Sequence, residues 1–138
     1  MTTVEEVRVA LADAAGSING WRAQPYITDS ANPPEIHVGV GTTDYDLVMG
    51  RGADIWNYRL IAYVSRVAER AGQVLLDELR APSGEASLKT VLEADTALAA
   101  LVDYVRVTQA SEVREVNLGT DTSPLRYLLV EFTVEVCY

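Results

Sequence analysis

The last extended segment of the chain most narrowly limits what the chain can fold into. Between residues 128 and 136 every second residue is apolar: Leu128, Val130, Phe132, Val134 and Val136. The residues between them are mostly polar, with two glutamates and a threonine. A period of two places the apolar side chains on one face of a β-strand. Residues 125–136 are therefore predicted to form a strand that buries one face.

Residues 55–65 predict a second strand with the same alternation. Its apolar face carries Trp56, Tyr58, Leu60, Ala62 and Val64. Eleven extended residues reach about 36 Å, which is longer than a strand of the usual five or six residues. We therefore expect part of this strand to project beyond the sheet. Trp56 and Tyr58 then have two interpretations: they belong to the core, which the shared face favours, or they anchor a neighbouring subunit.

The other predicted elements follow from periodicity and from capping residues. A helix begins after Thr2 or Thr3 and ends at Asn19-Gly20, and a second helix over 67–79 turns Ala71, Val74, Leu75 and Leu79 inward. Ser87 caps a short helix, and a helical turn covers 95–101. The remaining strands are predicted over residues 21–27, 35–40 and 104–116.

This order of elements predicts the fold class. Strands in hairpin-like pairs indicate a mainly antiparallel sheet, and helices between the pairs pack on one face of it. The result is a single α+β domain over residues 1–138, with a β-hairpin arm as a further expectation. Hydrophobic residues make up 49% of the chain, which is enough for a core at this length.

Groups that could perform catalysis are few. The one histidine, His37, has no second histidine or nearby cysteine with which to hold a metal, and we expect it at the surface or at an interface. The one cysteine, Cys137, cannot form an internal disulfide. Asp44 and Asp46 are interpreted as part of a solvated loop and not as a cation site. We predict no catalytic residue, no cofactor and no metal.

The charge argues against some partners. The net charge is −9, spread over both halves of the chain, so no basic stripe is present to bind phosphates. No apolar run approaches the roughly 20 residues that span a bilayer, and the acidic N-terminus does not resemble a secretory signal. We therefore expect a protein made in the cytoplasm that binds neither nucleic acid nor membrane.

The ordered set of local patterns resembles one family. A helix ends in Ile18-Asn19-Gly20, and a loop ends in Asn32-Pro33-Pro34 directly before the strand Glu35 to Val40. A long strand and a helix follow, and the chain closes on Leu-Leu-Val-Glu-Phe-Thr-Val-Glu-Val. This order is similar to that of the tail terminator and head–tail joining proteins of long-tailed bacteriophages, especially those of actinobacterial hosts. The single lysine among eleven basic residues fits such a host.

The resemblance implies a structural role in the virion. Tail terminators form a hexameric ring on the last ring of the major tail tube protein, stop tube polymerisation, and present a surface to the head–tail connector or stopper. DNA passes through the lumen without specific binding. The family has no catalytic residues to carry over.

The segment from Gly41 to Trp56 is the expected arm of such a ring. Its candidate subunit-interface residues, with the start of the following strand, are Tyr45, Leu47, Met49, Arg51, Trp56 and Tyr58. Two alternatives remain open: a connector or stopper subunit of the same neck, and a small acidic ligand-binding α/β domain of the host.

Overall fold

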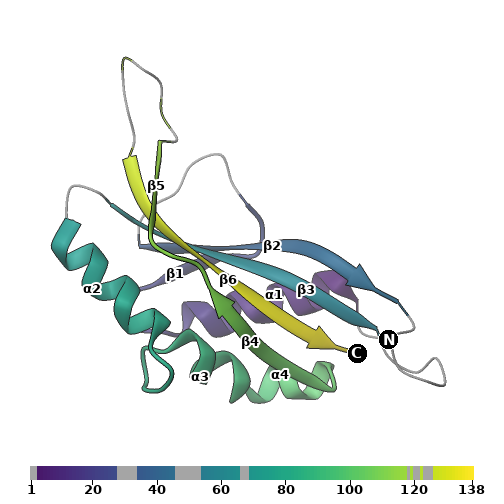
Figure 1. Ribbon diagram of the computed structural model, residues 1–138. Coiled ribbons are helices and arrows are strands. Elements are labelled where there is room, and N and C mark those ends of the chain that lie inside the picture. Colours follow the sequence, from purple (N-terminus) through teal and green to yellow (C-terminus); the bar gives the residue numbers. More distant parts are fainter. Residues whose placement is uncertain are drawn as a thin grey trace.

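A sheet is the framework of the protein. The computed structural model describes residues 3–27, 34–45, 54–65, 69–117, 119, 122 and 126–138, and six strands of these form the sheet (Figure 1). The strands are β1 (Arg22–Gln24), β2 (Glu35–Asp44), β3 (Ile55–Ser65), β4 (Tyr104–Ala110), β5 (Arg114–Asn117) and β6 (Arg126–Cys137). The helices are α1 (Val4–Gly16), α2 (Glu69–Arg80), α3 (Leu88–Glu93) and α4 (Thr96–Leu101).

The sheet is antiparallel except at one edge. Neighbouring strands follow the order β1-β2-β3-β6-β4, and β5 pairs with the beginning of β6. Among the described strands, β1 and β2 are the one pair that runs parallel. The four helices lie together on one face of the sheet, as Figure 1 shows. The predicted α+β class, with a mainly antiparallel sheet and helices on one face, is confirmed. No helix in the described part of the chain has the length and apolar character that crossing a membrane requires.

The long strand β3 lies inside the sheet along its whole length. Each of its eleven residues has a partner in β6, from Ile55 opposite Cys137 to Ser65 opposite Tyr127. On its other side, β2 pairs with it from Tyr63 to Ile55. The expectation that part of this strand projects beyond the sheet is therefore wrong. The strand is long because it has a neighbour on each side.

The first helix matches its prediction closely. Thr3 caps α1: its hydroxyl oxygen accepts from the Glu6 amide at 3.1 Å, and the Glu6 carboxylate accepts from the Thr3 amide at 3.2 Å. This reciprocal pair satisfies two amides at the start of the helix. Val7 and Leu11 lie on its buried side. Gly20 has a φ of 92°, which explains why a glycine stands after the helix.

The second helix buries a different side from the predicted one. Leu79 is buried, but Ala71 and Val74 are exposed, and Gly72 and Leu76 are buried in their place. The cause is a close approach to β3. A Cβ atom at position 72 would lie 2.9 Å from Cγ2 of Val64, so the glycine permits the contact and sets which side of the helix turns inward.

The predicted strand 104–116 is two strands. β4 ends at Ala110 and β5 begins at Arg114, and a bulge interrupts the ladder between Val107 and Gln109. Both pieces pair with the same side of β6. The bend between them forms a depression at the edge of the sheet.

Trp56 and Tyr58 belong to the core. Trp56 is 6% exposed and its ring lies 5.6 Å from that of Tyr138, measured between centroids. Tyr58 is fully buried, and its hydroxyl donates to the main-chain oxygen of Val4 at 3.0 Å. Burial raises the pKa of Tyr58 to about 12, although the positive charge of Arg8 acts the other way. The core interpretation is confirmed. The alternative interpretation, in which Trp56 and Tyr58 anchor a neighbouring subunit, is corrected, because neither side chain is exposed.

The outer edge of β4 is closed by side chains of α3. The amide of Val107 donates to Oε2 of Glu93 at 3.0 Å, and Nζ of Lys89 donates to the main-chain oxygen of Val107 at 3.5 Å. Lys89 and Glu93 also pair with each other at 2.5 Å, one helical turn apart. Both edge groups of Val107 are therefore occupied, which protects this position against pairing with another strand.

Truncation of Trp56 tests its place in the core. We expect Trp56→Ala to lower the free energy of unfolding by about 3–5 kcal/mol, since a large side chain leaves a cavity in the core. Tyr45→Ala is the matched control, because Tyr45 is 73% exposed. Its effect should stay within about 0.5 kcal/mol. Urea denaturation followed by far-UV circular dichroism, which reports on the backbone and not on the tryptophan, measures the free energy of unfolding of both variants. Equal stability of the two variants would contradict the placement of Trp56.

Glu93 should contribute stability that depends on pH. Burial raises the pKa of its carboxyl, but the hydrogen bonds from Lys89 and from the Val107 amide, with the positive charges of Lys89 and Arg106, outweigh burial and lower it. The unfolded chain binds the proton more tightly than the folded one, so the contribution is full above the ordinary glutamate pKa and is lost as pH falls through the folded pKa.

Glu93→Gln keeps the shape of the side chain and removes this titration. We expect the variant to be less stable than the original by about 1 kcal/mol at pH 7, and the difference to shrink at acid pH. Urea denaturation across a pH series measures it, with Glu78→Gln on exposed α2 surface as control. A difference that stays constant down to pH 3 would show that the edge contact does not depend on the carboxylate.

Candidate interaction surface

The face of the sheet opposite the four described helices is the main candidate surface. The alternation that sends one set of β3 and β6 side chains into the core sends the other set to this face. Its central residues on those strands are Asn57, Arg59, Ile61, Tyr63, Tyr127, Leu129, Glu131, Thr133 and Glu135. This face therefore carries both polar and apolar side chains, and its charged groups lie near the middle.

Glu131 joins three strands on this face. Its carboxylate lies 3.5 Å from Nη1 of Arg59 on β3 and 3.2 Å from Nη2 of Arg114 on β5. The two arginine side chains are about half exposed, and that of Glu131 is 23% exposed. Exposed ion pairs of this kind add little stability one at a time. Their arrangement instead leaves guanidinium N–H groups that can bind further acceptors, because each arginine has five.

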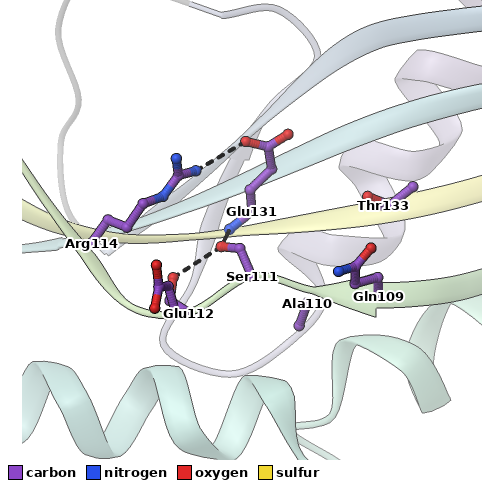
Figure 2. A pocket seen from close by; sticks show the side chains of 7 residues that line it. All are labelled: Gln109, Ala110, Ser111, Glu112, Arg114, Glu131 and Thr133. Carbon is purple, nitrogen blue, oxygen red and sulfur yellow. Dashed lines mark hydrogen bonds and ion pairs between the residues drawn. The ribbon is translucent and has the colours of Figure 1, made fainter.

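A depression lies where β4 bends into β5. Figure 2 shows Arg114 reaching across it to Glu131, with Ser111 between the two strands. Its volume is about 530 Å³, and its lining residues are Gln109, Ala110, Ser111, Glu112, Arg114, Glu131 and Thr133. The lining is mainly polar and carries both signs of charge, so it suits a polar contact more than an apolar ligand.

Ser111 holds the bend in place. Its amide donates to the main-chain oxygen of Glu131 at 2.8 Å, and the amide of Glu131 donates back to its hydroxyl oxygen at 2.9 Å. The hydroxyl in turn donates to the main-chain oxygen of Glu112 at 3.0 Å. The amide and the hydroxyl of Ser111 therefore make three hydrogen bonds, all to backbone groups. This is a structural role, and the hydroxyl has no general base in these contacts.

A second polar contact lies near the end of β6. The Tyr104 hydroxyl donates to Oε1 of Glu135 at 2.6 Å. This hydrogen bond, which burial and the charge of Glu135 reinforce, raises the pKa of Tyr104 to about 12. Tyr104 and Glu135 lie on the same face of the sheet as Arg59, so the polar side chains on this face continue toward the end of β6.

His37 is not a surface residue, and this corrects the sequence-based expectation. Its side chain is fully buried, and Nε2 lies 2.5 Å from Oε1 of Glu35, which is 5% exposed. The ring of Tyr63 packs 5.0 Å from that of His37 on the same face. The alternation that predicted a polar outer face was correct for β2. However, at this edge of the sheet the outer face is covered, so its polar residues pair with each other.

The predicted interface residues are only partly described. Tyr45 directly follows β2 and is 73% exposed, and its role at an interface stays a prediction. Leu47, Met49 and Arg51 lie outside the described residues, as does the rest of the middle of the expected arm, residues 46–53, which includes Asp46. Trp56 and Tyr58 lie in the core, on the opposite face from Arg59.

Sequence reasoning missed the group formed by Arg59, Arg114 and Glu131. The signal was present in part, because Arg59 and Glu131 both occupy the polar positions of strands whose alternation was recognised. What the sequence lacked was the register that brings them together across a long separation along the chain.

Metal ligands do not gather in the described part of the chain. Among those residues, no group of three or more histidine, cysteine or acidic side chains is placed to hold an ion. Cys137 is buried, and burial raises the pKa of its thiol, as do the nearby carboxylates of Asp103, Glu135 and Asp54. Comparison with models of known protein families and with curated protein sequences found no match.

The buried pair of Glu35 and His37 is testable by a double-mutant cycle. We expect His37→Leu to cost about 3–5 kcal/mol, because it leaves a buried carboxylate without its imidazole. Glu35→Leu/His37→Leu should cost clearly less than the sum of the two single changes, since the apolar pair leaves no buried charge behind. Urea denaturation of the four proteins measures the coupling. Additive effects would mean that the two side chains do not depend on each other.

Proposed function

We propose that this chain is a non-catalytic structural subunit of a phage virion. In this proposal, six copies form a ring that caps the end of the tail tube, stops its polymerisation and joins the tail to the head. The ring contacts the major tail tube protein on one side and the head–tail connector or stopper on the other. The family resemblance of the sequence is the source of this assignment.

The uncovered face of the sheet is the structural observation that supports the proposal best. The four helices of the described residues lie on the other face, so among these residues a surface with Arg59, Arg114 and Glu131 is left for contact with another protein. Protein interfaces combine an apolar centre with a polar rim and favour arginine. Ile61 and Leu129 are only partly buried beside these charges, which fits that composition.

The polar groups of the described residues also favour a binding role over catalysis. His37 is fully buried and pairs with Glu35, where a substrate does not reach it. Ser111 uses its hydroxyl and amide to hold the β4–β5 bend. Catalysis needs a nucleophile and a base in one accessible site, and these two side chains serve the fold instead.

The charge of the chain is compatible with a ring around DNA. Six copies, each with a net charge of −9, carry about −54 together. A negatively charged lumen repels the phosphate backbone and lets DNA pass without sticking.

Capping of purified tail tubes tests the proposal. We expect the protein to bind only the ends of tubes assembled from the cognate tube protein, to stop their further growth, and to give a ring of six subunits by mass photometry or negative-stain imaging. A ring that binds the connector and leaves tube growth unchanged would favour the neck alternative. A strict monomer that ignores tube ends and binds a small molecule would overturn the proposal in favour of a ligand-binding domain.

A further inference from the structure

A small hollow lies between β4 and the connection from α2 to α3. Its volume is about 180 Å³, and residues of α2, α3, β4 and β6 line it. Leu79 and Phe132, both almost fully buried, form its floor together with Val107. Arg80 and Lys89 are the charged residues of its lining. The hollow therefore combines an apolar floor with basic side chains.

The size of the hollow suits one side chain and not a small-molecule ligand. Sites for small molecules usually enclose about 300–1,000 Å³. An aromatic side chain with a polar tip can bury its ring in a smaller space and keep its hydroxyl at the opening, where Thr108 and Gln109 are exposed. The rest of such a ligand lies outside, which is typical of a side chain that anchors a protein partner.

The connection between α2 and α3 holds one wall of the hollow in place. Ser87 is fully buried, and its hydroxyl donates to the main-chain oxygen of Ala81 at 2.5 Å and accepts from the Thr90 amide at 3.3 Å. The Ala81 amide donates to the main-chain oxygen of Glu78 at 3.3 Å. A wall that is fixed before binding lowers the cost of ordering the contact.

The charge of the hollow differs from that of the chain. The chain has 20 acidic and 11 basic residues, yet both charged residues of the lining are basic. Lys89 is paired with Glu93 and donates to the main-chain oxygen of Val107. Arg80 takes part in none of the ion pairs of the described residues. Its guanidinium can therefore bind a carboxylate that the ligand brings.

A second apolar hollow, on the outside of α1, carries charge of the opposite sign. Its lining includes three acidic residues of that helix, Glu5, Glu6 and Asp13. These carboxylates repel an acidic ligand. Of the two hollows, the one beside β4 is therefore suited to an aromatic side chain that has a carboxylate next to it.

Tyr45 has both of these features. It is 73% exposed, which is more than any other large apolar side chain of the described residues. It directly follows Asp44, which is also exposed, so the ring stands beside a carboxylate. Tyrosine is one of the residue types that contribute most to binding at protein interfaces. Tyr45 therefore matches the hollow beside β4 in size and in charge.

The two parts lie too far apart to meet within one molecule. Figure 1 shows the end of β2, which Tyr45 follows, and the connection between α2 and α3 at opposite sides of the molecule. Tyr45 of one copy can therefore reach this hollow only in another copy. Because the two surfaces differ, such a contact repeats from copy to copy in one direction and closes when its rotation completes a circle.

We infer that copies of this chain join head to tail by inserting Tyr45 of one copy into the hollow beside β4 of the next, where Asp44 pairs with Arg80. This inference rests on the proposed function, because it supplies a contact between the subunits of the ring. The contact is separate from the uncovered face of the sheet, which is left for other virion proteins.

Photo-cross-linking between copies tests the position of Tyr45. The variant carries p-benzoylphenylalanine in place of Tyr45 and is mixed with isotope-labelled original protein, both free and on tube ends. Irradiation joins the benzophenone to C–H groups that it touches, and mass spectrometry locates the product. We expect the cross-links between copies in residues 79–82 and 107–110, which line the hollow. The same probe in place of Tyr26, an exposed tyrosine beside α1, is the control and should give no product there.

The outcomes separate this inference from the proposed function. Cross-links in the hollow together with tube capping support both. Capping by a ring whose cross-links lie elsewhere, or are the same for the Tyr26 probe, overturns the inference and leaves the function standing. Cross-links in the hollow of a protein that does not cap tubes support the contact and overturn the function. Absence of both overturns both.

Truncation of the tyrosine gives a second measurement. Tyr45→Ala should weaken association between copies about tenfold or more, because it removes the anchor of the contact. Its fold should stay intact, since the side chain is exposed. Tyr26→Ala is the matched control and should leave association unchanged. Sedimentation velocity of the free protein and subunit counts on capped tube ends measure association. A Tyr45→Ala protein that assembles like the original would overturn the inference.

A charge swap tests the pairing of Asp44 with Arg80. Asp44→Arg and Arg80→Asp should each weaken association about fivefold or more, because each brings like charges together. The double variant Asp44→Arg/Arg80→Asp should restore association. Arg70→Asp makes the same charge change at the start of α2, outside the contact, and should have no effect. A double variant that associates no better than the single variants would overturn the pairing.

Discussion

The pairing of β3 with β6 is the constraint on which the rest of the structure depends. Eleven consecutive residues of β3 are matched by β6, although the 60 residues from 66 to 125 separate the two strands along the chain. The alternation in both strands places Tyr58, Leu60, Phe132 and Val134 on one face, where they form the centre of the core. Because this pairing fixes one face as apolar, the described helices pack on that face, and the opposite face carries the polar residues together with a few apolar ones.

The face opposite the helices is the part of the fold on which the proposed function relies. Side chains that point away from the core have no packing role to fill, so they can be charged, and the register brings Arg59, Arg114 and Glu131 together. At the β2 edge the same face is covered, and the consequence is a buried pair, Glu35 with His37, in place of an exposed one. One strand pattern therefore produces a surface network in the middle of the sheet and an interior hydrogen bond at its edge.

The edges of the sheet show a second division of roles. Side chains of α3 close β4 at Val107, whereas β1 ends after three residues and leaves the far half of β2 without a described outer neighbour. At Val107, therefore, the β4 edge is protected against pairing with another strand.

Local patterns in the sequence determined a large part of this fold. The capping box at Thr3, the caps at Ser87 and Asp95, and the apolar faces of β3 and β6 all follow from residues close together in the chain. The α+β class follows from their order. These features depend on periodicity and on hydrogen bonds within one turn, which a sequence displays directly.

Only the tertiary structure decided which of these faces meet and how closely. The close contact between Gly72 and Val64 sets which side of α2 turns inward. β3 has a neighbouring strand on each side and does not project from the sheet. His37 is fully buried at the β2 edge, although its position in the alternation predicted an exposed side chain. The group of Arg59, Arg114 and Glu131 likewise exists only in the register of three strands. Each of these outcomes depends on contacts between residues distant in the chain, and a local pattern carries no information about the partner it will meet.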